Sequence, residues 1–441
     1  MNRKTTIMNR KTFLAGLSAL FVAGISLPAM AQSMPATVDQ PVTINFYNYN
    51  LANAGTGAEA TKKLLAEFMA ANPNITVEGI GYSAADASRI QADLAGGMSV
   101  DLVQTVFSDL DFSIHNFGAL ALEDIIPADE LAAHFEGMSP NGLKLGVLND
   151  KTYGLAYTFS TPVLFYNADL FTAAGLDPNS PPKNWAELKA AALTIKEKTG
   201  AMGFTAGALG SGAGGSDWMF QGIVRSNNGE VISRDRTTLK FAEPEAVEAV
   251  QTLRDLYDAG VYENVDFNGA LDNMASGNMA MYLQTSALQG ALVAGATGKY
   301  DLRATTMPAF GDKPTRPNNS GSALTIHAAD PLKQRAAWEL MKFLTSKHGY
   351  TVITSEIGYL PLRTDIVDDP AYLGEWVKAH PLVQPNLEQL ARLEPWDAMP
   401  GPNYRQIVKT MIEAGEMAVF GGADVAATMA DAQANAQALM P

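Results

Sequence analysis

The feature of this sequence that most constrains its fold is a regular alternation of strand-like and helix-like segments near its start. The strand-like segments are short and apolar or alternating, and the helix-like segments have an apolar face at helical spacing. They follow one another at 42–47, 55–71, 75–80, 84–95 and 100–107. A strand–helix–strand–helix–strand order predicts a parallel sheet with right-handed crossovers.

Sheets of this kind bind ligands at the carboxyl ends of their strands. The loops that follow the three predicted strands are therefore the first place to look for a binding site. They comprise residues 48–55, 81–85 and 108–113.

A second informative stretch, residues 161–188, reads TPVLFYNADLFTAAGLDPNSPPKNWAEL. Its apolar run at 163–166 predicts a buried strand. A helical turn should follow and end at Gly175, which can adopt the left-handed conformation of a helix end. Asn184 then has the position of an N-cap, and Glu187, three residues later, completes a capping box. The stretch thus predicts a strand, a turn, a proline-rich loop and a capped helix.

The amino-acid sequence of this stretch is more specific than the secondary structure that it predicts. LFYNADLFTAAGLDPNSPPKNWAEL resembles the signature of extracellular solute-binding protein family 1 of ABC importers, which contains the maltose- and glycerol-3-phosphate-binding proteins. The preceding Ser160-Thr161-Pro162 most resembles the glycerol-3-phosphate-binding branch. The family usually has threonine where this chain has Asn184, and both side chains can cap a helix. Weaker resemblance extends over 277–286, 319–362 and 402–420.

The resemblance implies an α/β fold of the two-lobed periplasmic-binding-protein type (type II). Each lobe would be a mostly parallel sheet flanked by helices, and three crossings would join the lobes. We assign residues 42–159 plus 317–350 to the N-terminal lobe, and residues 160–316 plus 351–441 to the C-terminal lobe. The crossings are expected near 152–159, within 308–320 and near 358–362.

Residues 1–31 have the pattern of a secretory signal peptide, with basic residues, an apolar run and a small-residue cleavage site. A membrane anchor is the alternative, but the apolar run is short for a span. MNRKT occurs at Met1 and again at Met8, so either could be the start. The chain has no cysteine and therefore no disulfide or lipid-anchor thiol. We expect a periplasmic monomer.

The net charge of the chain is −15, and removal of the four basic residues of the signal peptide would make it −19. Nucleic-acid binding needs a basic face, so we expect no nucleic-acid partner. The resemblance instead implies two kinds of partner, a small polyol phosphate or sugar and the permease subunits of an ABC transporter. An anionic ligand would have to be met by local donors.

The resemblance also implies a set of ligand contacts, carried over residue by residue. They are Tyr82 after the second strand, Ser160, Ser286 after the methionine-rich strand, Gly321 through its backbone, Tyr359 in GYLPL, and Arg405 as a phosphate clamp. The branch has a glutamate after the third strand, where this chain offers Ser108 or Asp109. Trp218, behind a glycine-rich loop, is a further candidate. Each has an ordinary alternative as a half-buried aromatic, a turn residue or a solvated arginine.

Other chemistry is less well supported. The string GSGAGG at 210–215 matches a dinucleotide fingerprint, with Glu230 downstream, but it lacks the strand and helix that the motif requires. The five histidines have no metal-ligand spacing, so we expect no metal and no cofactor. Asp109 and Asp111 are the pair that a secreted carbohydrate-active enzyme would use. We expect a binding protein, not an enzyme, with glycerol 3-phosphate or a related glycerophosphodiester as ligand. A neutral mono- or oligosaccharide is the alternative.

Overall fold

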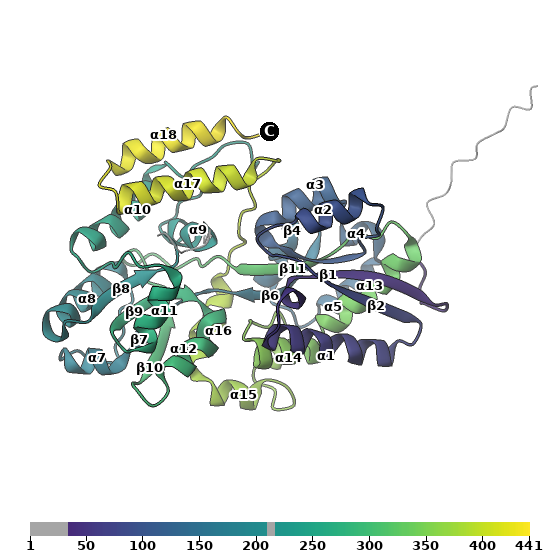
Figure 1. Ribbon diagram of the computed structural model, residues 1–441, viewed down its shortest axis with the longest axis horizontal. Helices are drawn as coiled ribbons and strands as arrows, with labels where there is room; N and C mark the ends of the chain where they lie inside the picture. The colour runs from purple at the N-terminus through teal and green to yellow at the C-terminus, as the bar shows by residue number, and fades with distance from the viewer. Residues whose placement is uncertain (1–33, 210–216) are drawn as a thin grey trace, which may run out of the picture. The chain divides into compact units, whose positions relative to one another are not determined.

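The computed structural model describes residues 34–209 and 217–441 (Figure 1). The predicted signal peptide and the GSGAGG string lie outside these ranges. Among the helices of the described ranges, none is both long and apolar enough to cross a membrane.

Five strands form the first sheet, in the order β2-β1-β3-β11-β6. Their bounds are Val42–Asn48 (β1), Ile75–Gly81 (β2), Leu102–Val106 (β3), Gly154–Ser160 (β6) and Ser320–Ile326 (β11). β1 pairs in parallel with β2 and β3, as the alternation of segments predicts. β11 pairs antiparallel with β3 and β6. Segments from distant parts of the sequence therefore complete this sheet.

Four strands form the second sheet, in the order β10-β7-β9-β8. Their bounds are Pro162–Asn167 (β7), Met202–Ala206 (β8), Met279–Thr285 (β9) and Leu302–Thr306 (β10). β8 and β9 are parallel, but β7 is antiparallel to both of its neighbours. A small separate pair joins Val147–Leu148 (β4) to Lys151–Thr152 (β5).

Both sheets are mixed, and in each of them one strand runs against the others, β11 in the first sheet and β7 in the second. A helical crossover within one sheet is what makes consecutive strands parallel. β7 enters the second sheet directly from β6 of the first, and β11 returns to the first sheet after β10 of the second. Neither strand arrives through a crossover on its own sheet, so neither has to run parallel to its neighbours.

Helices cover the two sheets (Figure 1). Up to β6 they are Thr56–Ala71 (α1), Ser88–Ala95 (α2), Leu110–Phe117 (α3), Leu122–Ile125 (α4), Ala128–Phe135 (α5) and Pro140–Leu143 (α6). Between β7 and β11 they are Ala168–Ala173 (α7), Trp185–Thr199 (α8), Asp217–Ser226 (α9), Pro244–Asp258 (α10), Phe267–Ala275 (α11) and Gln289–Ala296 (α12). After β11 they are Pro331–Leu344 (α13), Lys347–Val352 (α14), Gly374–Ala379 (α15), Gln384–Gln389 (α16), Tyr404–Val419 (α17) and Val425–Gln437 (α18).

Short single-turn helices connect several of these elements. They are Tyr49–Ala52 (η1), Phe107–Asp109 (η2), Lys144–Gly146 (η3), Ser286–Leu288 (η4), Ile353–Ile357 (η5, a π-helix), Thr364–Ile366 (η6), Pro381–Val383 (η7) and Leu390–Arg392 (η8). Two of them, η1 and η2, lie in the loops that follow β1 and β3.

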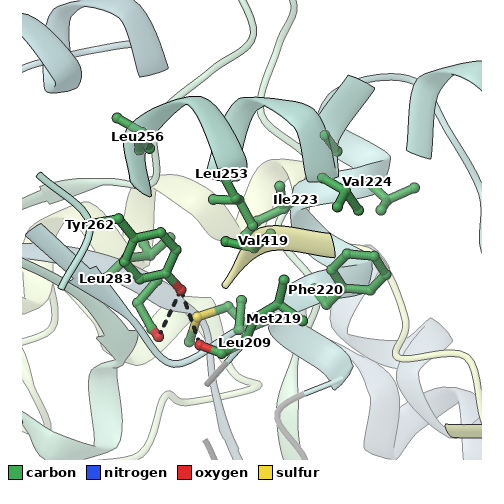
Figure 2. Close-up of a cluster of buried hydrophobic side chains, with 14 of the residues drawn as sticks. Leu209, Met219, Phe220, Ile223, Val224, Leu253, Leu256, Tyr262, Leu283 and Val419 are labelled. Carbon is green, nitrogen blue, oxygen red and sulfur yellow. Dashed lines mark hydrogen bonds between the residues drawn. The ribbon is translucent and has the colours of Figure 1, made fainter. Parts of the chain in front are cut away.

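Each sheet has a buried core of its own, which gives the chain its two lobes. Figure 2 shows part of the second core, where α9, α10 and α17 pack on the sheet through Ile223, Leu253 and Val419. The hydroxyl of Tyr262 is satisfied there by the carbonyl oxygen of Leu209, at 3.1 Å. Side chains as far along the chain as Leu393 pack in the first core. The predicted division of the lobes at residue 350 stays a prediction.

The capped helix predicted from the sequence is confirmed in detail. The Asn184 side chain accepts a hydrogen bond from the Glu187 backbone N–H at 2.9 Å, at the start of α8. The Glu187 carboxylate reaches back to accept from the Lys183 backbone N–H at 2.8 Å. Gly175 has a φ of 80° just after α7, as its predicted left-handed conformation requires.

Candidate ligand-binding site

The three loops expected to line a site each supply a side chain or carbonyl group to one region of the first lobe. Tyr49 comes from the loop after β1, Tyr82 and Ala85 come from the loop after β2, and Asp109 ends η2 after β3. The Tyr49 and Tyr82 rings meet edge to face with centroids 6.4 Å apart. The carboxyl ends of these parallel strands thus lie at one edge of the sheet, as the topology rule requires.

Arg405, at the start of α17 in the second lobe, meets this edge. Its Nη2 donates to Oδ2 of Asp109 at 3.0 Å, and its Nη1 donates to the carbonyl oxygen of Ala85. Its Nε donates to the Tyr404 hydroxyl at 2.7 Å, which in turn donates to Oδ1 of Asp109 at 2.7 Å. Arg405 and Tyr404 therefore hold both oxygens of one carboxylate across the two lobes. We call Arg405, Tyr404 and Asp109 the arginine cluster.

The electrostatics of the arginine cluster follow from its unequal burial. The Asp109 side chain is 10% exposed, whereas that of Arg405 is 48% exposed. Burial raises the pKa of Asp109 above its ordinary value, although the hydrogen bond from Tyr404 and the charge of Arg405 oppose this shift. Burial also raises the pKa of Tyr404, and the Asp109 charge adds to it. The half-exposed guanidinium is thus the part of this cluster that a dissolved ligand can reach.

A group of hydroxyls lies behind the tyrosines. The Tyr49 hydroxyl lies 2.7 Å from Oγ1 of Thr158 and donates to Oγ of Ser322 at 3.1 Å. The side-chain amide of Gln104 donates to the same two oxygens, at 3.0 and 3.1 Å. Burial raises the pKa of Tyr49, so its hydroxyl stays protonated as a donor. This network fixes the tyrosine at the strand ends.

Tyr359 joins the same group from the GYLPL segment. Its pKa lies well above the ordinary value, first because of the neighbouring Tyr49 and then because of burial. Burial likewise raises the pKa of Tyr82, and the neighbouring Tyr49 and the Asp109 carboxylate add smaller contributions to that shift. The predicted site residues Tyr82, Asp109, Tyr359 and Arg405 therefore belong to one connected region.

Ser160, Ser286 and Gly321 lie where the two sheets meet. Oγ of Ser160 is 2.7 Å from Oγ1 of Thr285, so this serine links β6 to the end of β9. The Ser286 backbone N–H donates to the Thr161 carbonyl oxygen at 3.0 Å, while its buried hydroxyl has no hydrogen-bond partner among the described residues. Gly321 has a φ of 106° and faces the backbone of Thr158. The ligand contacts predicted for these three residues stay predictions.

The two remaining candidates have different surroundings. Ser108 is half-buried, and its hydroxyl donates to Oδ1 of Asp109 at 3.3 Å. Of these two neighbours, Asp109 is the one that contacts Arg405. Trp218 is buried in the core of the second lobe, on α9. Its ligand contact also stays a prediction.

Sequence reasoning missed Tyr49, Tyr404 and the Gln104–Thr158–Ser322 group. Tyr49 lies inside a loop that the strand pattern had already singled out, and Tyr404 is the neighbour of a predicted residue. Gln104, Thr158 and Ser322 lie on strands, and nothing in the sequence indicates that their side chains would meet. Among the described residues, no group of three acidic or histidine side chains is placed to hold a metal ion.

A family model described as bacterial extracellular solute-binding protein matches residues 63–385. The chain belongs to this family. The predicted extracellular, periplasmic location is confirmed by that match and by periplasmic relatives. This solute-binding protein is 26% identical to a binding protein of Brucella abortus (strain 2308) over 95% of its own length and 97% of the relative's. It is 30% identical to the sn-glycerol-3-phosphate-binding periplasmic protein UgpB of Pectobacterium atrosepticum, over 47% of this chain and 48% of that one.

Solved structures show the same fold. The cyclic alpha-maltosyl-1,6-maltose binding protein from Arthrobacter globiformis superposes with a TM-score of 0.79, covering 90% of this chain and 99% of the other at 23% identity. UgpB from Mycobacterium tuberculosis, solved in complex with glycerophosphocholine, has a TM-score of 0.75, covering 90% and 98% at 21% identity. These likenesses confirm the two-lobed, type II fold of this solute-binding protein.

Proposed function

We propose that this solute-binding protein takes up glycerol 3-phosphate or a related glycerophosphodiester between its lobes and delivers it to the permease of an ABC importer. The observation that carries the proposal is the arginine cluster, in which a half-exposed guanidinium from one lobe reaches the strand ends of the other. The resemblance to glycerol-3-phosphate-binding relatives supports the same choice.

Arg405 has the donors that a phosphate needs. A guanidinium carries five N–H groups, and the contacts to Tyr404, Ala85 and Asp109 use three of them. Two N–H groups are left for phosphate oxygens, and arginine pairs well with phosphate through two donors. The tyrosine and serine hydroxyls nearby would receive the glycerol hydroxyls.

A neutral sugar is the second candidate, and one observation favours it. The charge of Arg405 is already matched by Asp109, so the cluster has little net charge to attract an anion. Paired donors and acceptors beside aromatic rings are also what a sugar requires. Catalysis by Asp109 and Asp111 is not part of the proposal, because each carboxylate is paired with an arginine, Asp111 with Arg236 at 2.9 Å.

The test is calorimetric titration of ligand-free mature protein with glycerol 3-phosphate, glycerophosphocholine and maltose. The proposal expects saturable binding of a phosphate ligand that Arg405→Ala weakens at least tenfold. Arg303→Ala is the matched control, because Arg303 is also paired with an aspartate but lies on β10 of the second sheet. Binding of maltose alone, unaffected by Arg405→Ala, would establish the sugar instead.

A further inference from the structure

A hollow of about 420 Å³ lies in the second lobe, between α8, α10 and the loop that follows β10. Both helices are on the side of the second lobe that faces away from the first lobe (Figure 1). The described residues that line the hollow include no member of the arginine cluster. We call it the α8–α10 hollow and define it by Trp185, Lys189, Asp255, Leu256 and Phe310. Its volume is within the range of small-molecule sites, which run from ~300 to 1,000 Å³.

Part of the lining of the hollow is apolar and aromatic. The rings of Trp185 and Phe310 have their centroids 6.0 Å apart and are tilted by 52°. These two residues and Leu256 are buried in the core of the second lobe, so packing holds them in position. The indole N–H of Trp185 has no hydrogen-bond partner among the described residues. Buried indole nitrogens usually have one, so an acceptor is missing on this side of the hollow.

Two charged side chains of the hollow lack a partner of opposite charge. On α8, the Lys189 ammonium group makes no hydrogen bond or ion pair within the described part of the chain. On α10, the Asp255 carboxylate accepts a hydrogen bond from the neutral side-chain amide of Gln251 at 2.8 Å. No cation of the described residues pairs with this carboxylate. Lys189 and Asp255 therefore do not neutralise each other, although both line one hollow.

The other two charged side chains of the hollow, Lys313 and Glu248, are already held in place by one residue. Lys313 donates to Oδ1 of Asn227 at 2.6 Å, and Nδ2 of Asn227 donates to Oε2 of Glu248 at 2.9 Å. The same carboxylate oxygen lies 4.0 Å from the Lys313 ammonium, so these two charges offset each other. The charges that remain for a bound molecule are one ammonium on α8 and one carboxylate on α10.

We propose that the α8–α10 hollow binds a free amino acid with an apolar side chain. In its zwitterionic form, such a molecule carries a carboxylate for Lys189 and an ammonium group for Asp255. The carboxylate also supplies an acceptor beside the Trp185 indole, and the side chain lies against the rings of Trp185 and Phe310. A ligand of one sign fits less well, because it would place a like charge beside Lys189 or Asp255. The site is separate from the one proposed for a phosphate or sugar.

Calorimetric titration at pH 7 with three aromatic probes tests the two charges separately. The probes are L-phenylalanine, 3-phenylpropionate, which lacks the ammonium group, and phenethylamine, which lacks the carboxylate. We expect saturable binding of L-phenylalanine. Each of the other probes should bind about fivefold more weakly, the effect of losing one partly exposed ion pair.

Two substitutions in the hollow assign each charge to its partner. Lys189→Met removes the ammonium group and keeps most of the length of the side chain. It should weaken L-phenylalanine binding about fivefold and leave the affinity for phenethylamine unchanged. Asp255→Asn should weaken L-phenylalanine binding to a similar extent and leave the affinity for 3-phenylpropionate unchanged. Both residues are at the surface of their helices, so the urea midpoint should stay the same.

Lys198→Met and Asp258→Asn are the matched controls. Lys198 lies on α8 and pairs with Glu197, and Asp258 follows Asp255 on α10 and pairs with Arg254. Neither residue lines the hollow. Both control variants should bind all three probes as wild type does.

The remaining outcomes would overturn the inference. Absence of L-phenylalanine binding by folded protein, or binding of 3-phenylpropionate or phenethylamine as tightly as L-phenylalanine, would exclude a zwitterion site. Loss of L-phenylalanine binding in Arg405→Ala, with none in Lys189→Met, would assign the amino acid to the region of the arginine cluster. The proposed function fails separately, because it is tested with phosphate ligands and maltose, whose affinities Lys189→Met and Asp255→Asn should not change.

Discussion

At the scale of single residues, Asp109 and Asp217 are both buried carboxylates, but their partners differ in charge. Asp109 has the guanidinium of Arg405 beside it. The Oδ2 atom of Asp217 accepts hydrogen bonds from the indole of Trp396 at 2.7 Å and from the amide of Gln221 at 3.1 Å, and both of these donors are neutral. Burial raises the pKa of Asp217 to about 7, although these bonds oppose the shift. Near neutral pH this carboxyl group is therefore partly protonated.

Asp217→Asn should change how stability depends on pH. Because the folded-state pKa of Asp217 is raised, its contribution to the stability of the folded protein is fully present at about pH 4. That contribution is lost as the pH rises toward 7. One pKa unit corresponds to ~1.4 kcal/mol. The free energy of unfolding of the variant, relative to that of wild type, should therefore rise by at least ~1 kcal/mol between pH 4 and pH 7. Urea unfolding at pH 4, 5, 6 and 7 measures this difference. Parallel pH profiles for the two proteins would show that Asp217 does not titrate in this range.

Gly321 lies at a position where the backbone conformation requires glycine. Its φ of 106° strains any other residue, and an added Cβ would lie 1.9 Å from the carbonyl oxygen of Thr158 on the neighbouring strand. Gly321→Ala should therefore lower the free energy of unfolding by ~2 kcal/mol or more. Urea denaturation checks this, with Gly57→Ala as control. Gly57 lies in α1, and its added Cβ would make only ordinary contacts, the nearest at 3.6 Å. An unchanged midpoint for Gly321→Ala would contradict the structural requirement.

At the scale of elements, α8 depends on its capping box. Asn184→Ala removes the acceptor for the Glu187 N–H and should cost ~1 kcal/mol of stability. Asn184→Thr keeps a side-chain oxygen in place and should cost only a few tenths of that. Thermal or urea unfolding of the two variants checks the prediction. Equal losses would mean that the side-chain bond contributes little and that the loop at 177–183 holds the helix start.

Local patterns such as this cap were predictable because their causes lie within a few residues of sequence. The same holds for α13, which spans Pro331–Leu344, because Asp330 caps it and Pro331 occupies its first turn. The direction of β7 and β11 was not predictable in this way, because it depends on which sheet each strand joins. A family signature recovered the two lobes, but not the orientation of these strands.

The candidate site shows the same limit. The loops after β1, β2 and β3 were predictable from strand order, and so was the choice of Arg405 from the family resemblance. Its pairing with Asp109 joins residues almost 300 positions apart, and no local pattern encodes such a contact. The unpartnered state of the buried Thr354 hydroxyl and Asn386 side-chain nitrogen is harder still to predict, because it depends on everything packed around them.

At the scale of the whole molecule, two neighbouring aspartates of the first lobe make contacts with the second lobe. The Asp109 carboxylate accepts a hydrogen bond from Arg405. Oδ2 of Asp111 accepts one from Nη2 of Arg236 at 2.9 Å. The ring of Phe112, the residue after Asp111, packs against Tyr404, with centroids 5.5 Å apart. Asp111 belongs to α3 of the first lobe, whereas the neighbours of Arg236 in the sequence are buried in the second core. This group of contacts thus joins the lobes next to the candidate site.

Arg236→Gln tests whether these contacts set the balance between joined and separated lobes. The pair is largely buried, with side chains 15% and 6% exposed, so its loss should favour separation. We expect a larger radius of gyration for the ligand-free variant by small-angle X-ray scattering. We also expect ligand affinity to fall about three- to tenfold although Arg236 is outside the proposed contacts, because a ligand that binds the joined form must first restore it. Arg254→Gln is the control, since Arg254 pairs with Asp258 within α10. If both variants match wild type in size and affinity, the Arg236–Asp111 pair does not set the balance between joined and separated lobes.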